Sequence, residues 1–509
     1  MQNHILDYLN TIVETKADKV AYSDGTESLT FGQVYRQSRG IGTALFDRGL
    51  RKRPILVFMS KSPQEIAAFF GVVAGGCFYV PVDEEMPGGR IQLIMDNVRA
   101  PLMICDRTTI GKAKEFSLKG TEPVLYDELA KREPDDEALR RIYRSALDTD
   151  PVYLVFTSGS TGIPKGVAAC HRSVIDYIEQ LSEVMGFDEN TVFGNQTPLY
   201  VDACLKEIYP TVKFGATTYL IPRKCFSLPA MLVEYLNRWK INTICWVVSA
   251  LTMVSAFGTF ESVKPKYLHT IAFGSEVFPI RQFRRWREAL PEADFVNLYG
   301  PTEATGMCCY YRVDREFEEG ETIPVGKPFP NREILLLTGD GREAADGEEG
   351  EICVRGSSLA LGYYNDPERT AAAFVQNPLN TAYPERIYRT GDIGKRNERG
   401  ELLFVSRKDS QIKHMGHRIE LGEIEVNAAM VPDVHMAACI YDPDRAKILL
   451  FYTGELSEAE LTGRLKERLP RYMLPNRTVR LAQMPLTPNG KTDRMALRGM
   501  GAQKNKRKD

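Results

Sequence analysis

The sequence lacks the features that mark a secreted, metal-clustering or membrane-spanning protein. Its ten cysteines include no C-x-x-C pair, and the adjacent Cys308 and Cys309 suit neither a disulfide nor a common zinc spacing. The first residues lack the charged and apolar segments of a signal peptide. The longest apolar stretch, residues 66–82, contains three glycines and Pro81, which is typical of a helix, a turn and a strand rather than of a membrane span. We therefore expect reduced thiols and a cytoplasmic location.

Net charge is also nearly absent. The chain has 65 Lys and Arg against 67 Asp and Glu, a net charge of −2 at pH 7, so no general basic surface is available for nucleic acid. The basic residues at 504–508 are interpreted as a solvated chain end rather than a binding tail. A length of 509 residues is too great for one ordinary core, so two or more domains are expected.

Strand-like and helix-like segments alternate through the first four hundred residues. Residues 55–59, 77–82 and 102–105 are short apolar runs that predict strands. Between the first two, Ser62 is a plausible N-cap and Pro63 fits the first turn of a helix. This pattern predicts an α/β fold with largely parallel sheets.

A loop rich in glycine and hydroxyl groups follows a fourth strand-like run, residues 152–155. Its sequence, FTSGSTGIPKGV at residues 156–167, lacks the Walker A spacing. Glycines let backbone N–H groups face an anion without steric cost, and Lys165 adds a positive charge. We interpret the segment as a phosphate-binding loop rather than a flexible surface turn. Its predicted phosphate ligands are Thr157, Ser158, Gly159, Ser160, Thr161, Gly162 and Lys165.

The loop resembles the signature of the adenylate-forming superfamily, which includes acyl-CoA synthetases, luciferases and the adenylation domains of nonribosomal peptide synthesis. Further motifs follow in the family's order: NLYGPTE at 297–303, YRTGD at 388–392, SRKDSQIK at 406–413 and PNGKTDR at 488–494. The resemblance implies a large N-terminal AMP-binding domain of layered α/β subdomains, residues 1–408. It also implies a small mobile C-terminal α+β domain, residues 409–509, hinged at Asp409.

The resemblance also implies a site for ATP and Mg²⁺. Lys491 matches the catalytic lysine that bridges the substrate carboxylate and the α-phosphate, and Thr302 could donate to that phosphate. Glu303 matches the glutamate that coordinates Mg²⁺, since a carboxylate beside phosphates is repulsive unless a cation intervenes. Asp392 would accept from the ribose hydroxyls, with Arg407 beside it. The other implied nucleotide contacts are Gly274, Ser275, Glu276, Asn297, Leu298, Tyr299 and Gly300.

The substrate class depends on Asp202, an acidic residue within an apolar stretch. Such an aspartate is costly to bury unless it is paired, although it could instead cap a helix. In the amino-acid-activating branch of the resembled family, the matching aspartate holds the substrate's α-ammonium group. Lys206 either faces this pocket, where it would favour an acidic substrate, or pairs with Glu207 or points to solvent. Further implied pocket positions are Ala203, Trp246, Ala272, Gly274, Leu298 and Gly306, with Trp246 expected to shorten the pocket.

The acceptor of the activated substrate is expected to be a separate molecule. Nothing after Arg494 resembles a carrier domain, and the length and motifs resemble those of the D-alanine–carrier protein ligases, although Cys204 to Lys206 depart from their small apolar pocket. The leading interpretation is an ATP-dependent ligase that loads an amino acid onto a phosphopantetheinylated carrier protein in trans. The alternatives are an acyl-CoA synthetase that uses free coenzyme A, against which Asp202 argues, and a catalytically silent adenylate-binding scaffold, against which the intact Lys491 argues.

Overall fold

The computed structural model describes residues 2–159, 162–408, 411–443, 445–486 and 492–503. The chain forms two compact units. Unit 1 comprises residues 1–84, 98–155 and 166–408, and unit 2 comprises residues 85–97, 156–165 and 409–509. Both units mix helices with strands, so the predicted α/β fold class is confirmed.

The largest sheet of unit 1 has nine strands in the order β15-β14-β13-β12-β11-β9-β10-β1-β2. The strands from β13 through β12, β11, β9 and β10 to β1 pair in parallel, whereas β14, β15 and β2 are antiparallel to their neighbours. Parallel strands end at one edge, where loops can gather ligand-binding groups. The bounds are β1 (Val20–Ser23), β2 (Ser28–Thr30), β9 (Val192–Asn195), β10 (Thr217–Leu220), β11 (Thr243–Val247), β12 (Thr270–Gly274), β13 (Asp294–Tyr299), β14 (Cys309–Arg312) and β15 (Lys327–Pro328).

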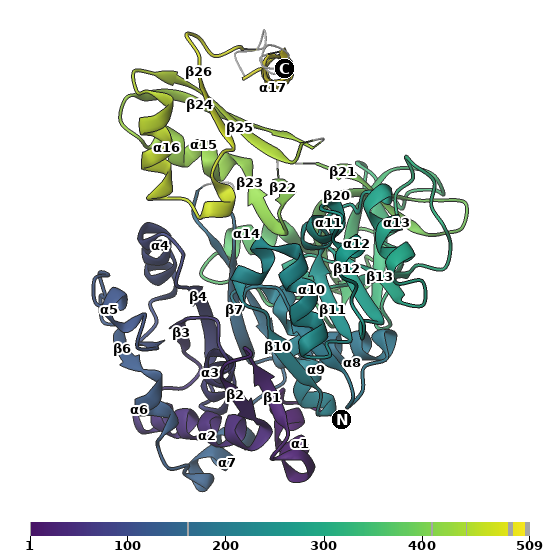
Figure 1. The fold of residues 1–509 in the computed structure, drawn as a ribbon. Helices are drawn as coiled ribbons and strands as arrows, with labels where there is room; N and C mark the ends of the chain where they lie inside the picture. Colours follow the sequence, from purple (N-terminus) through teal and green to yellow (C-terminus); the bar gives the residue numbers. More distant parts are fainter. Residues whose placement is uncertain (1, 160–161, 409–410, 444, 487–491, 504–509) are drawn as a thin grey trace. The chain divides into compact units, whose positions relative to one another are not determined.

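Apolar side chains cover both faces of this sheet. On one face, Trp246 and Phe273 pack in a buried cluster with α10 (Pro229–Arg238), α11 (Val248–Ala256) and α13 (Ile280–Ala289), which lie against β11–β13 in Figure 1. On the other face, residues such as Ala272 and Leu298 join a cluster with α8 (His171–Met185) and α9 (Leu205–Phe214). Because side chains alternate along a strand, neighbouring residues of β11–β13 belong to different clusters.

The second sheet of unit 1 has seven strands in the order β18-β8-β7-β4-β3-β5-β6, and the pairs among β3 to β7 are parallel. The predicted strands are confirmed. The predicted helix start is also confirmed, because the Ser62 hydroxyl accepts from the Glu65 N–H at 3.2 Å and Pro63 opens α3. The bounds are β3 (Pro54–Met59), β4 (Phe78–Asp83), β5 (Leu102–Cys105), β6 (Glu122–Leu125), β7 (Pro151–Thr157), β8 (Lys165–Cys170), β18 (Gly362–Tyr363) and α3 (Pro63–Ala74).

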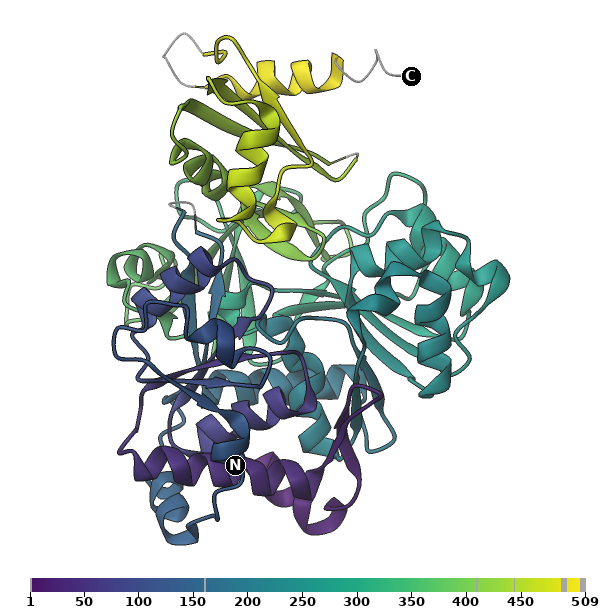
Figure 2. The same ribbon diagram turned by 60° about the vertical axis from the view of Figure 1, so that its left-hand side comes forward.

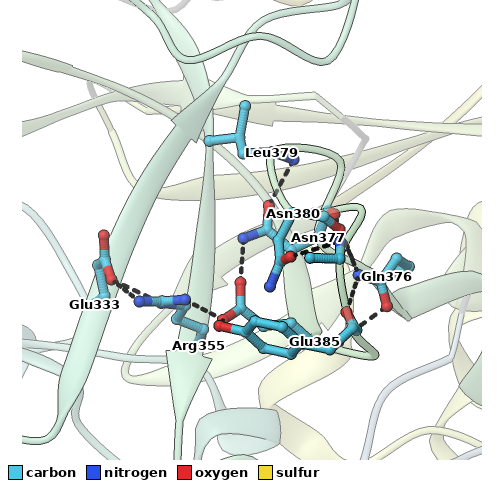
Figure 3. A network of polar contacts seen from close by, with 9 residues as sticks. Glu333, Arg355, Gln376, Asn377, Leu379, Asn380 and Glu385 are labelled. Carbon is cyan, nitrogen blue, oxygen red and sulfur yellow. Dashed lines mark hydrogen bonds and ion pairs between the residues drawn. The ribbon is translucent and has the colours of Figure 1, made fainter.

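A third, antiparallel sheet brings together two residues expected at the ribose. It comprises β16 (Arg332–Leu337), β17 (Gly350–Gly356), β19 (Phe374–Gln376), β20 (Arg386–Arg396) and β21 (Leu402–Arg407). Asp392 of β20 lies opposite Arg407 of β21 in the strand register. Away from this pair, Arg355 of β17 forms ion pairs with Glu333 and Glu385, as Figure 3 shows. These latter contacts are partly exposed and fasten the strands of the sheet.

Unit 2 contains a β-hairpin and a three-stranded sheet covered on both faces, as Figure 2 shows in green and yellow. Helices α15 and α16 share one buried cluster with the sheet, and Leu497 of α17 belongs to a cluster on the other face. The bounds are β22 (Gln411–His414), β23 (His417–Glu420), β24 (Val434–Asp442), β25 (Lys447–Gly454), β26 (Arg477–Arg480), α15 (Leu421–Ala429), α16 (Glu458–Lys466) and α17 (Arg494–Gln503).

The remaining helices include α2, whose apolar side chains join the same buried cluster as those of α3. Within the described ranges, no helix is long and apolar enough to cross a membrane. All ten cysteines are buried and free, as predicted. The remaining bounds are α1 (Asp7–Lys16), α2 (Phe31–Asp47), α4 (Gly88–Val98), α5 (Ile110–Ala113), α6 (Tyr126–Ala130), α7 (Asp136–Arg144), α12 (Thr259–Ser262), α14 (Pro367–Ala373), and the 3₁₀ turns η1 (Asp202–Cys204), η2 (Arg223–Ser227), η3 (Thr302–Ala304) and η4 (Arg471–Met473).

Candidate active site

The predicted phosphate loop connects β7 to β8 and belongs to unit 2. The Gly159 N–H donates to the Glu423 carboxylate at 3.1 Å, and the Ser158 hydroxyl donates to the Arg418 carbonyl at 2.8 Å. Gly162 has φ +79°, a left-handed conformation that favours glycine. One backbone N–H of the loop thus donates to a carboxylate. Of the other predicted ligands, Thr157 ends β7 and Lys165 begins β8, whereas Ser160 and Thr161 lie outside the described residues.

Tyr299, Asp392 and Arg407 meet in unit 1 at the predicted ribose position. The Tyr299 hydroxyl donates to Asp392 Oδ2 at 2.5 Å, and Arg407 forms an ion pair with Asp392 Oδ1. Burial, followed by the charge of Asp392, raises the pKa of Tyr299 well above its usual value, so the phenol remains a donor. Both Asp392 oxygens therefore accept from the protein, which fixes the orientation of the carboxylate.

Glu303 lies fully buried in η3, immediately after Thr302. The Tyr363 hydroxyl donates to Glu303 Oε1 at 2.7 Å, and the Ala360 N–H donates to the Glu303 carbonyl at 2.9 Å. The described residues contain no group of three or more His, Cys, Asp or Glu side chains that could hold a metal. A single oriented carboxylate nevertheless fits Mg²⁺, which proteins commonly bind through one or two carboxylates together with phosphate oxygens and water.

The adenine-side positions lie where β12 and β13 end. Gly274 ends β12, and a Cβ there would lie 2.2 Å from the Leu298 carbonyl oxygen, so the close strand approach requires glycine. Ser275 has φ +69°, which explains why glycine is usual at this position in the resembled family. The Glu276 carboxylate accepts from the Ser249 N–H at 2.8 Å, in the first turn of α11. The Asn297 amide donates to the Pro324 carbonyl at 2.8 Å.

Asp202 opens η1, next to Ala203. Burial is the main cause that raises the pKa values of Tyr153 and Tyr177, and the charge of Asp202 is the second cause for both. The Asp202 carboxylate therefore lies near both phenols. The hydroxyls of both tyrosines are buried and have no hydrogen-bond partner among the residues that the structure describes. Gly306, with φ +86°, faces the Tyr177 ring, which a Cβ there would approach to 2.7 Å. Asp202 and Gly306, both predicted substrate residues, therefore both lie near Tyr177.

The other predicted pocket residues separate into two groups. Ala272 and Leu298 share a buried cluster with Cys245 of β11, whereas Trp246 belongs to the cluster on the opposite face of the sheet. The Trp246 indole N–H donates to the Gly194 carbonyl at 2.7 Å. The structure thus does not bring Trp246 together with Ala272 and Leu298. Cys245, one residue earlier, occupies that face because strand side chains alternate.

Comparison with known proteins identifies the family. The family described as AMP-binding enzyme matches residues 9–364, and the one described as AMP-binding enzyme C-terminal domain matches residues 423–491. The chain belongs to the AMP-binding enzyme family. The predicted family membership and its two-domain fold class, a large N-terminal domain and a smaller C-terminal domain, are confirmed.

Relatives of this AMP-binding enzyme act in amino acid chemistry. It is 29% identical to the D-alanine–D-alanyl carrier protein ligase of Bacillus licheniformis, covering 97% of this chain and 99% of that protein. It is 30% identical to tyrocidine synthase 1 of Brevibacillus parabrevis, covering 95% of this chain but only 44% of that protein. Holo-PA1221, described as a nonribosomal peptide synthetase protein with adenylation and carrier domains, aligns with a TM-score of 0.82 and 25% identity over 97% of this chain and 84% of that chain. Family membership identifies an AMP-forming ligase.

Several side chains of this AMP-binding enzyme that contact the predicted site residues were not themselves predicted. Tyr363, which orients Glu303, lies sixty positions away, in the short strand β18. Glu423 and Arg90, which form a buried ion pair in unit 2 beside Gly159, are likewise far apart in sequence. Neither contact left a local signal, because each depends on tertiary folding. Lys491 and Asp409, the predicted catalytic lysine and hinge, lie outside the described residues.

Proposed function

We propose that this protein activates an amino acid as its aminoacyl-AMP and transfers it to the phosphopantetheine thiol of a carrier protein in trans. The substrate carboxylate attacks the α-phosphorus of ATP and pyrophosphate leaves. The carrier thiolate then attacks the acyl carbon and AMP leaves. The main support is the position of Asp202, whose carboxylate lies near Tyr153 and Tyr177. A carboxylate there suits an α-ammonium group, whereas the uncharged tail of a simple carboxylic acid would leave it buried without a cation.

The nucleotide side supports the first half-reaction. Asp392, held by Tyr299 and Arg407, is oriented to accept from two ribose hydroxyls. Glu303 would hold Mg²⁺, which neutralises phosphate charge when it is bound. Lys491 would place its charge between the substrate carboxylate and the α-phosphate. Because one face must serve both half-reactions, we infer that the C-terminal domain, residues 409–509, moves about Asp409 between them.

An acyl-CoA synthetase is the second candidate. An o-succinylbenzoate CoA synthetase from Bacillus subtilis shares the fold, with a TM-score of 0.81 at 20% identity over 96% of this chain and 98% of that chain. Fold likeness at this identity does not separate the two activities. Asp202 favours the amino acid over an acyl or aryl acid.

Pyrophosphate exchange over a panel of L- and D-amino acids tests the proposal. Exchange should depend on an amino acid. In a separate assay, a radiolabelled amino acid should pass to a phosphopantetheinylated carrier protein rather than to free coenzyme A. Lys491→Ala should lower aminoacyl-AMP formation by roughly two orders of magnitude, as for other oriented electrostatic groups. Asp409→Pro should spare exchange and slow thioester formation. Exchange driven only by acids without an amino group would refute amino acid activation.

A further inference from the structure

Strand β20 bulges at the residue predicted to accept from the ribose. Opposite Ile352 of β17, where regular pairing allows one residue, β20 has the three residues 390–392. Gly391 at the centre has φ +73°, a left-handed conformation that favours glycine. A bulge of this kind redirects the side chains that it carries and is common next to active sites. The geometry of the bulge therefore decides where the Asp392 carboxylate points.

Two side chains replace the strand pairing that the bulge interrupts. Glu351 of β17 accepts from the Gly391 N–H through its Oε1 at 3.2 Å. The Thr390 hydroxyl donates to the Ile352 carbonyl at 2.7 Å and accepts from the Asp392 N–H at 3.0 Å. Buried backbone groups need such partners, because an N–H or C=O left without one is costly. The bulge is thus held by side chains as well as by the backbone.

Cations orient the Glu351 carboxylate. The side chain of Glu351 is only 7% exposed, and its Oε2 accepts from the Arg389 Nε at 3.0 Å and also from the Nη2 of the same arginine. The Lys408 ammonium lies 3.7 Å from the same oxygen. Charge-assisted hydrogen bonds are stronger than neutral ones, so Oε2 is fixed. Oε1 is then presented to the Gly391 N–H in one position.

A third contact holds the bulge through its carbonyl group. The Lys408 N–H donates to the Gly391 carbonyl at 2.8 Å. Gly391 therefore has both backbone groups bonded, to Glu351 through its N–H and to Lys408 through its C=O. Asp392 follows directly and is 3% exposed. A displacement of Gly391 on loss of Glu351 would therefore move Asp392 through the peptide unit that joins them.

We infer that Glu351 is a positioning residue for the nucleotide, which holds Gly391 so that the Asp392 carboxylate meets the ribose hydroxyls. The inference rests on the proposed function for the role of Asp392, and Glu351 acts only through the bulge. Both oxygens of Glu351 are required, because one engages Arg389 and the other engages Gly391. A glutamine has one acceptor oxygen and an NH₂ group that would face a donor, so it cannot serve both.

Calorimetric titration with ATP and with 2′,3′-dideoxy-ATP, each with Mg²⁺, tests the inference without an amino acid. The wild type should bind ATP at least about 10-fold more tightly, the range for a hydrogen bond to a charged group. Glu351→Gln should raise the Kd for ATP by about 5-fold and leave the Kd for the dideoxy analogue within about 2-fold, since only the ribose contacts are displaced. A residue that only supports the fold would weaken the binding of both nucleotides alike.

Glu333→Gln is the matched control. Glu333 pairs with Arg355, four positions further along β17 than Glu351, so neither Kd should change. If Glu351→Gln weakens both nucleotides by the same factor, or neither, the inference is overturned. A wild type that does not distinguish the two nucleotides would overturn the ribose role of Asp392 and the inference with it. Because no amino acid is present, failure of amino acid activation in the exchange assay remains a separate outcome. If Glu351→Gln fails to fold, Glu351→Asp, which keeps the charge but retracts the carboxylate by one methylene, gives the same decision.

Discussion

The nucleotide side and the substrate end of unit 1 treat buried charge in opposite ways. Asp392 is paired with Arg407 and accepts from Tyr299, and Glu303 accepts from Tyr363. At the start of α9, which follows the predicted substrate residue Asp202, the ammonium of the buried Lys206 has no such contact among the described residues. A charge paired within the protein contributes to folding before any ligand binds, whereas a buried charge without a partner opposes folding. The two regions should therefore respond differently to loss of a charge.

The largest effect is expected on the nucleotide side. Asp392→Ala leaves the Arg407 guanidinium, 12% exposed, without its carboxylate. We expect the free energy of unfolding to fall by about 4 kcal/mol without ligand, the range for breaking one partner from a buried pair. Urea unfolding of the ligand-free wild type and variant measures this loss of unfolding free energy.

Glu333→Ala is the control for that variant. It removes the Arg355–Glu333 ion pair of the same sheet, which Figure 3 shows. Both side chains of this pair are more than a third exposed. A partly exposed pair of this kind contributes less than about 1 kcal/mol. If both variants lose the same unfolding free energy, the Asp392–Arg407 ion pair stabilises the fold no more than a partly exposed surface pair does.

The pH dependence of stability provides the next effect. The pKa of Glu207 rises from 4.5 in the unfolded chain to about 7 in the fold, mainly through burial. Between these values the folded state binds more protons, so the unfolding free energy should fall as pH rises from about 4.5 to 7, by about 3 kcal/mol. Glu207→Gln should remove this slope, so its advantage over the wild type should grow with pH. If the unfolding free energies of the wild type and Glu207→Gln change with pH in parallel, the raised pKa of Glu207 is not the cause of the slope.

The sequence predicted the architecture better than it predicted the side-chain partners. The strand expected before the loop is present as β7, although it extends to Thr157, and the strand β8 that follows from Lys165 was not predicted. Asp392 lies opposite Arg407 in the strand register. The strand follows from a local apolar run, whereas the proximity of Asp392 and Arg407 was implied by the family resemblance. By contrast, a one-residue shift along β11 decides whether Trp246 or Cys245 faces Ala272, and no local pattern fixes that register. The burial of Lys206 likewise depends on both sheets that enclose α9.

The smallest effect separates the two regions most directly. Lys206→Met replaces a buried, unpaired ammonium with an apolar side chain of similar length, which is neutral or stabilising when no partner is lost. We expect the ligand-free protein to be as stable as the wild type or up to about 1 kcal/mol more stable, by the same urea unfolding. Lys213→Met, which gives up the pair with the 44%-exposed Glu179, should lose no more than about 1 kcal/mol. A loss of several kcal/mol in Lys206→Met would instead mean that Lys206, like Asp392, is already paired within the protein.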